Sequence, residues 1–85
     1  MIQPHHLRGF QVRAARGLLG WSVSDLASTS GVSQDAIRKA EAAVGDLPLS
    51  AKAIRLLLIA FATHKVVFTK DFSRIGVALD LRERT

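Results

Sequence analysis

The stretch over 21–41, WSVSDLASTSGVSQDAIRKAE, constrains the fold more than any other part of the chain. Ser22 and Ser33 each precede a run that suits a helix, and serine is among the residues that best cap a helix N-terminus. Asp25 follows Ser22 at capping-box spacing and brings a negative charge to the first turn. Gly31, between the two runs, has the backbone freedom that a tight turn needs. The stretch therefore predicts two short helices joined by a turn.

The small and apolar residues of this stretch are spaced as two steeply crossing helices require. The predicted helices cover 22–30 and 34–43. Ala27 provides a small contact between the helices, and Val32 fills the angle between them. The inward positions are Leu26, Ile37 and Ala40. This spacing predicts a helix-turn-helix unit over 22–42, in which the second helix stands out as a convex rod able to enter the major groove of DNA.

A further helix is predicted before this unit, over 7–19. Gly20 can end it in the left-handed conformation that is common just past a helix C-terminus. Residues at helical spacing predict one apolar face, which we expect to be buried: Leu7, Phe10, Ala14 and Leu18.

The chain after the unit predicts one more helix and a strand pair. The run over 50–64, with Ser50 as its N-cap, is apolar nearly all round, so we expect it to be buried on more than one side, in part by a second subunit. Two β-branched and aromatic runs within 66–80 flank a polar connection and predict a short β-hairpin, which must pack on a helix or a partner because an isolated hairpin is marginal in water. The expected fold is mainly α: a single four-helix domain over 1–85 with a C-terminal β-hairpin.

Composition removes several classes of site. The 85 residues include no cysteine, which excludes disulfides, thiolate metal ligands and cysteine nucleophiles. His5, His6 and His64 have neither cysteine nor a nearby carboxylate pair beside them, and no serine stands in a nucleophile elbow. No apolar run reaches the roughly 20 residues of a membrane span, and the N-terminus lacks the apolar core of a signal peptide. We expect a cytoplasmic protein that is not an enzyme. We also expect it to bind no cofactor and no metal.

The positive charge is unevenly distributed. The formal net charge is +5, a balance that favours polyanionic partners. Residues 1–49 carry an excess of one basic residue over acidic ones, whereas residues 50–85 carry an excess of four. The predicted helix pair is therefore close to neutral, and most of the excess lies after it.

The pattern LLGWS-x-x-x-LA-x-x-x-GVS-x-x-x-I-x-x-x-E, within residues 15–41, resembles the Cro/phage-repressor type of helix-turn-helix regulators, the XRE family. In that family an arginine of the first helix pairs with a glutamate that ends the recognition helix. The resemblance places this pair on Arg16 and Glu41 and implies that it is a structural ion pair. We expect Trp21 to be a core residue, because a stacking site for single-stranded nucleic acid needs several exposed aromatic side chains.

The resemblance also implies where DNA is contacted. The base-reading positions of the family fall on Ser33, Gln34, Asp35 and Lys39. The Gln34 amide could make a bidentate contact to adenine. Asp35 could accept a hydrogen bond from cytosine N4, or could simply favour the positive start of its helix. Arg38 and Lys39 are candidates for phosphate or base contacts.

The expected function is that of a sequence-specific transcriptional regulator that binds double-stranded DNA, a repressor or autoregulator acting as a homodimer on a two-fold related operator. The alternative is a protein-binding helix-turn-helix module, an antiactivator or antitoxin that sequesters another regulator or a toxin. Val23 favours the alternative, because it stands where family members that bind phage operators usually carry a phosphate-contacting glutamine.

Overall fold

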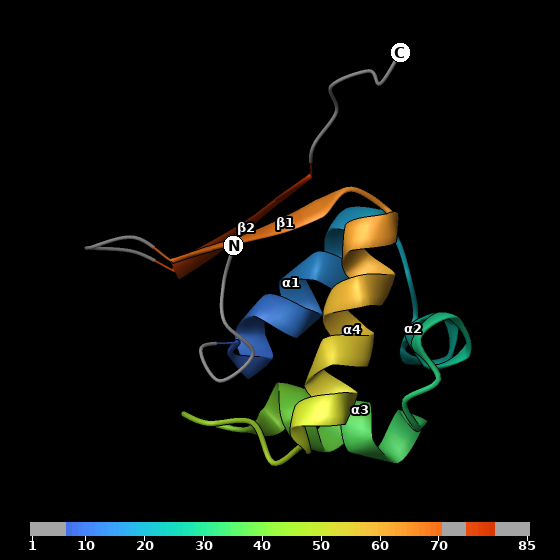
Figure 1. Ribbon diagram of the computed structural model, residues 1–85, viewed down its shortest axis with the longest axis vertical. Coiled ribbons are helices and arrows are strands. Elements are labelled where there is room, and N and C mark those ends of the chain that lie inside the picture. Colours follow the sequence, from blue (N-terminus) through green and yellow to red (C-terminus); the bar gives the residue numbers. More distant parts are fainter. Residues whose placement is uncertain (1–6, 71–74, 80–85) are drawn as a thin grey trace.

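The computed structural model describes residues 7–70 and 75–79, and this part of the chain is mainly helical, as expected. It contains four helices, α1 (Gly9–Leu19), α2 (Val23–Ser30), α3 (Gln34–Ala42) and α4 (Ala51–Thr63). Two short strands follow, β1 (Val66–Lys70) and β2 (Ile75–Leu79) (Figure 1). The observed helices lie within two residues of the predicted ones at every end. His5 and His6 lie outside the described residues.

Serine caps start three of the four helices. The hydroxyl oxygens of Ser22, Ser33 and Ser50 each accept a hydrogen bond from the backbone N–H three positions on, at 3.0–3.1 Å. Gly31 ends α2 with a φ of +83°, a left-handed conformation that costs a residue with a side chain more than it costs glycine. Helix α3 ends one residue earlier than predicted, because Ala43 is already extended, with φ −71° and ψ +141°.

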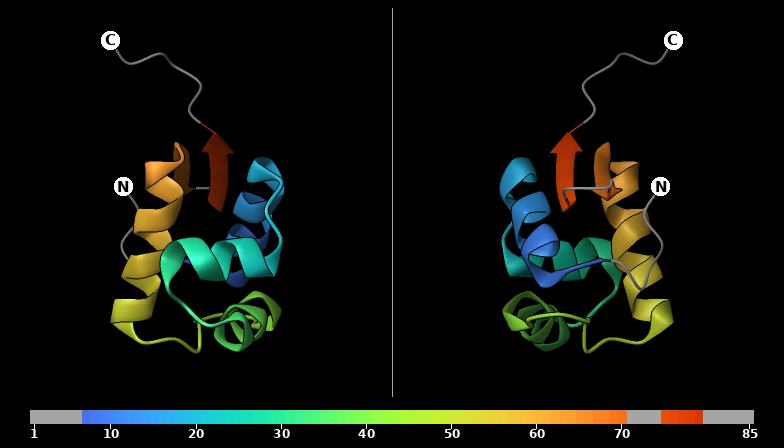
Figure 2. Two further views of the ribbon diagram at one scale, coloured as in Figure 1. Left: turned by 90° about the vertical axis from the view of Figure 1, so that its right-hand side faces the viewer. Right: turned by 90° about the vertical axis from the view of Figure 1, so that its left-hand side faces the viewer.

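The helices enclose one core. Helices α1 and α4 stand on opposite sides of the molecule, with α2 between them and α3 across one end (Figure 2). The largest fully buried side chains come from all four helices and from the segment before α1: Phe61, Leu7, Leu26, Ile37, Leu57, Gln11 and Val12. The predicted inward positions Val32, Ile37 and Ala40 are buried, and Ala27 is half-buried. Trp21 is also half-buried, with its ring 6.0 Å from that of Phe61.

The predicted buried face of α1 is wrong. Leu7 is buried, but Phe10 is 57% exposed, Leu18 is 45% exposed and Ala14 is exposed. The buried residues of α1 are instead Gly9, Gln11, Val12 and Ala15. Helical spacing defined the stripe Phe10–Ala14–Leu18 but could not say which stripe packs. The stripe that packs is the one that contains Gly9, where α1 approaches α3 closely. A Cβ built on Gly9 would overlap the Ala40 carbonyl oxygen and lie 3.2 Å from the Glu41 Cα.

The two strands lie at the end of the molecule opposite α3 (Figure 1). They pair antiparallel, with Val66 opposite Leu79 and Lys70 opposite Ile75. Val66 and Phe68 are buried, and the Phe68 ring lies 5.5 Å from that of Phe61 in α4. The connection 71–74 and the tail 80–85 of the expected hairpin region lie outside the described residues.

Candidate nucleic-acid interface

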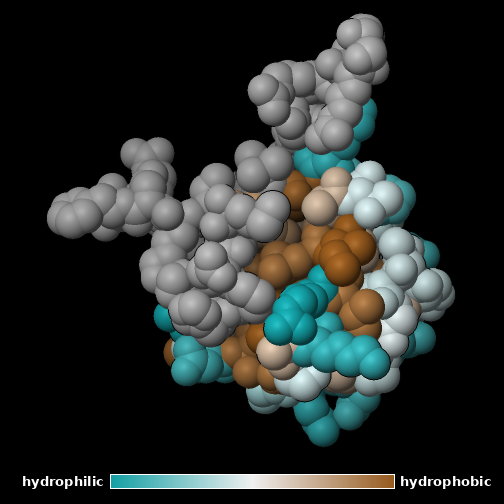
Figure 3. Space-filling view, in the orientation of Figure 1, coloured by the Kyte–Doolittle hydropathy of each residue, from teal (hydrophilic) through white to brown (hydrophobic). Residues whose placement is uncertain are grey.

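One face of α3 is polar and exposed. Four of the five side chains that the sequence proposed for DNA contact stand on it, namely Gln34, Asp35, Arg38 and Lys39, and Ser33 is exposed at the N-cap just before it. The opposite face is anchored in the core, where Ile37 and Ala40 are both 0% exposed. Figure 1 places α3 along the lower edge of the molecule, and hydrophilic residues gather along the same edge in Figure 3. The fold thus brings the five candidate residues together on one accessible surface.

Four side chains on the exposed face of α3 interact with each other in two pairs. An Arg38 Nη2 group donates a hydrogen bond to Gln34 Oε1 at 3.1 Å, and the Lys39 ammonium lies 3.2 Å from an Asp35 carboxylate oxygen. Both pairs join residues four apart, so they form two neighbouring ridges along the helix. With two cations and one anion, the face has a formal net charge of +1. Sequence reasoning missed both pairs, although the four-residue spacing was a signal for them.

Ser33 and Val23 stand at the starts of the two helices. The Ser33 hydroxyl oxygen accepts from the Ala36 N–H at 3.1 Å, so its structural role is that of the α3 N-cap, while its own proton can still be donated. Val23, the first residue of α2, is half-buried against the core. Its side chain has no hydrogen-bond donor for a phosphate contact, and part of it is taken up in packing against the core.

The ion pair expected between Arg16 and Glu41 is present. The guanidinium donates from Nε and Nη2 to the two carboxylate oxygens of Glu41 at 2.7 and 2.8 Å. Its Nη1 group donates to the Trp21 carbonyl oxygen at 2.9 Å. The Glu41 side chain is 6% exposed and that of Arg16 is 19% exposed. Hydrogen bonding to Glu41 raises the pKa of Arg16 above its already high ordinary value, so the guanidinium stays charged.

This pair holds α3 in place from two directions. Because Arg16 lies in α1 and Trp21 directly precedes Ser22, the N-cap of α2, a single side chain joins the end of α3 to α1 and to the start of α2. Arg13 is more loosely attached, with its Nε 3.7 Å from Glu41 and its side chain 67% exposed.

The start of α2 is held by a reciprocal cap. The Ser22 backbone N–H donates to the Asp25 carboxylate at 2.8 Å, while the Asp25 N–H donates to the Ser22 hydroxyl at 3.0 Å. The hydrogen bond from the Ser22 backbone, supported by the Ser22 hydroxyl, holds the pKa of the Asp25 carboxyl below its ordinary value. Aspartate therefore completes the capping box in spite of its short side chain.

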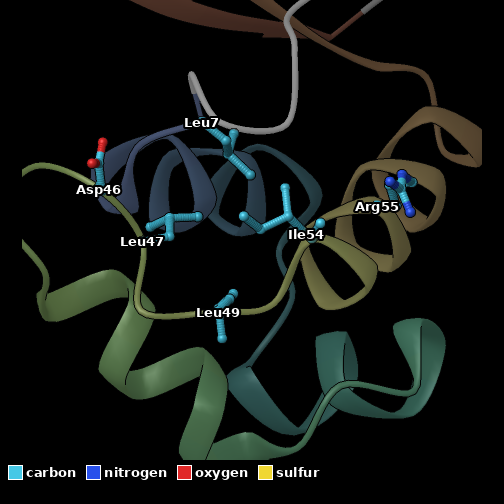
Figure 4. A pocket seen from close by; sticks show the side chains of 7 residues that line it. Leu7, Asp46, Leu47, Leu49, Ile54 and Arg55 are labelled. Atoms are coloured by element: carbon cyan, nitrogen blue, oxygen red, sulfur yellow. The ribbon is translucent and has the colours of Figure 1, made fainter.

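Outside α3 the described residues offer a shallow hollow of about 530 Å³. Its floor is apolar, and Asp46 and Arg55 stand at opposite sides of it (Figure 4). Sequence reasoning also missed that Asp46 is held by Arg8, whose Nη1 lies 3.2 Å from it. No group of three or more histidine, aspartate or glutamate side chains in the described part of the chain is placed to hold a metal ion.

Besides Arg38 in α3, the described cations that form no ion pair with another described residue include three in or just after α4. Lys52, Arg55 and Lys65 are exposed and form no ion pair with another described residue.

The longest described helix has 13 residues, and none of the helices in the described ranges has the length and apolarity to cross a bilayer. Comparison of the chain with protein-family models, curated proteins and solved structures finds no significant match.

Proposed function

We propose that this protein binds double-stranded DNA through the exposed face of α3 as a sequence-specific transcriptional regulator with a lambda-repressor-like helix-turn-helix fold closed by a C-terminal hairpin. The observation that carries the proposal is the two-sided character of α3. Its inward residues Ile37 and Ala40 are completely buried, while four polar side chains are exposed on its other side at one edge of the molecule and Ser33 is exposed at its N-cap. A helix held in this way can enter a major groove without disturbing the core.

The proposed form is a homodimer, acting as a repressor or autoregulator on an operator with two-fold symmetry. Two copies of α3 would then occupy successive major grooves, with half-site centres about 10 bp apart or a multiple of that. The surface of α4 and the strands is the proposed contact between the copies. Ile59, which is 61% exposed on α4, provides apolar area there.

Within each half-site, Gln34 contacts a base edge while Arg38 and Lys39 contact phosphate or bases. A bidentate amide contact discriminates against a wrong base by roughly 1–3 kcal/mol. A phosphate contact instead contributes about equally on every sequence and adds to the salt dependence of binding.

The test is a titration of duplex binding against salt concentration, using duplexes enriched from a random pool. A DNA-binding protein should show a log–log slope of several units, because each neutralised phosphate releases counterions. Lys39→Ala should lower affinity and reduce this slope by about one unit if Lys39 meets phosphate.

The control variant is Lys65→Gln, which removes a charge at the end of α4 farthest from α3 (Figure 1). It should leave the slope nearly unchanged. Absence of any duplex binding at low salt would refute the proposal.

The second candidate is a module that binds another regulator or a toxin through the same scaffold. The near-neutral face created by the Asp35–Lys39 pair, and the half-buried Val23, favour it. It predicts no salt-dependent binding to duplexes, and a stable complex with a protein partner. An antitoxin would combine both activities, and a gene for a small toxin beside its own gene would support that form.

A further inference from the structure

We propose that Gln34 and Arg38 act as one reading unit that selects guanine, in place of the adenine that glutamine alone would favour. The inference rests on the proposed binding of double-stranded DNA and concerns which base that surface recognises. It is carried by the hydrogen bond between the two side chains on the exposed face of α3.

The chemistry of the pair fixes which end of the Gln34 amide is engaged. A guanidinium group has hydrogen-bond donors and no acceptor, so the atom that meets Arg38 at 3.1 Å can only be the carbonyl oxygen. The Gln34 oxygen is thereby directed along the helix towards Arg38. The Gln34 NH₂ group is left as the end that can be presented to a base.

Adenine requires both ends of the same amide. In the usual bidentate contact, the glutamine oxygen accepts from adenine N6 while its NH₂ group donates to adenine N7. Reading adenine in this way requires the Gln34 oxygen, which is turned along the helix towards Arg38, to direct its second lone pair at adenine N6 with the Arg38 donors beside that amino group. A contact that uses donors alone requires no such change.

Guanine presents two acceptors, N7 and O6, in the major groove, and no other base does. The ridge formed by Gln34 and Arg38 offers donors from both side chains, with the Gln34 oxygen turned towards Arg38. Adenine and cytosine each carry an amino group in the major groove, and this group would face donors on that ridge. Guanine is therefore the base whose major-groove edge matches the pair.

The neighbouring ridge, formed by Asp35 and Lys39, offers an acceptor to the cytosine that pairs with this guanine. Asp35 is the acidic side chain on this face, and one of its oxygens is held by Lys39 at 3.2 Å. A carboxylate repels the acceptors of guanine and accepts from the amino group of cytosine. A G·C pair with its guanine under Gln34 and Arg38 and its cytosine towards Asp35 satisfies both ridges.

The experiment is selection of duplexes from a random pool with the intact protein and with Arg38→Ala. The wild-type protein should enrich guanine at one position in each half-site. Arg38→Ala frees the Gln34 oxygen, so preference at that position should shift towards adenine, with the guanine-to-adenine ratio falling at least about fivefold. Both residues are exposed, so circular dichroism should show an unchanged fold.

Two matched variants separate reading from general affinity. Gln34→Ala should weaken the guanine preference without creating one for adenine, because the amide is gone. Lys39→Ala should lower affinity on every duplex while guanine remains the preferred base, because Gln34 and Arg38 are intact.

Enrichment of adenine by the wild-type protein, a flat profile, or an Arg38→Ala profile identical to the wild type would overturn the guanine assignment while leaving DNA binding intact. Failure of every duplex to bind in a salt-dependent manner would instead refute the proposed function itself.

Discussion

At the scale of single residues, Arg16 is the side chain that connects three separate parts of the fold. Its three hydrogen bonds join α1 to the end of α3 and to the carbonyl of Trp21. Glu41 is almost fully buried, and it is held in that position by the charge of Arg16. Breaking one side of such a pair leaves a buried charge without compensation.

Glu41→Gln should lower the free energy of unfolding by about 3 kcal/mol, because the amide keeps the shape but leaves the Arg16 charge unpaired. Urea denaturation measures the change. The matched control is Arg13→Gln, which removes the exposed partner at 3.7 Å and should cost less than about 1 kcal/mol. Equal losses in the two variants would contradict the central role given to Arg16.

Asp25 should make stability depend on pH in the acid range. Its pKa is lowered in the folded state by the hydrogen bond from Ser22, so the charged form is favoured by folding. That contribution is present above the ordinary aspartate pKa of about 4 and is lost as the pH falls through the lowered folded value. Thermal unfolding of wild type and Asp25→Asn should therefore differ at neutral pH and converge in acid. A difference that stays constant with pH would contradict this.

Single residues could be predicted from the sequence where helix caps and turns determine the local structure. Val32, Ile37 and Ala40 could be placed because the glycine turn and the serine caps fix both helices around them. The ion pair of Arg16 with Glu41 came from the family resemblance, since its members are far apart in sequence. The bond between Gln34 and Arg38 was not foreseen, because an exposed side chain can choose between a helix neighbour and water.

At the scale of elements, α1 shows why an apolar stripe alone was insufficient. Leu7 stands just before the helix cap and Val12 stands in the position that a hydrophobic staple would use, and both are buried in the same cluster. Gln11 turns its amide oxygen back to the Arg8 N–H at 2.9 Å, which is the reciprocal half of a capping box. These start signals, read together, would have indicated the correct inward face.

The two glycines of α1 should respond in opposite ways to alanine. Gly9→Ala should destabilise the protein by about 1–3 kcal/mol, because its Cβ would collide with the Ala40 carbonyl and force α1 away from α3. Gly17→Ala meets nothing within 4 Å and should stabilise the helix by about 0.5–1 kcal/mol. Denaturation curves of both variants provide the test, and a stabilising Gly9→Ala would contradict the observed contact between the helices.

At the scale of the whole molecule, a core drawn from so short a chain depends on every element that contributes to it. The strands supply Val66 and Phe68, and Phe68 meets Phe61 from α4. The polar face of α3 lies at the other end of the molecule (Figure 1). The strands can therefore stabilise the domain without taking part in its proposed DNA contact.

Phe68→Ala should lower stability by about 3–5 kcal/mol, a large fraction of what a small domain possesses. Deletion of residues 66–85 removes Val66 as well and should abolish cooperative unfolding or leave a destabilised monomer. Urea denaturation and sedimentation equilibrium report the two outcomes. Ile59→Ser is the control for an exposed apolar residue: it should spare the monomer fold and weaken any dimer formed through α4. A stable dimer after truncation would show that the strands are peripheral.

The contact of Arg16 with the Trp21 carbonyl gives the buried ion pair a fixed polarity. A salt bridge between two side chains alone could be reversed by exchanging acid and base. Here a glutamate at position 16 would turn its oxygens towards the carbonyl oxygen of Trp21 and repel it, even with an arginine at position 41 to receive the charge. A charge-swapped protein would therefore not regain the lost stability, and any redesign of this domain must keep the base on α1 and the acid on α3.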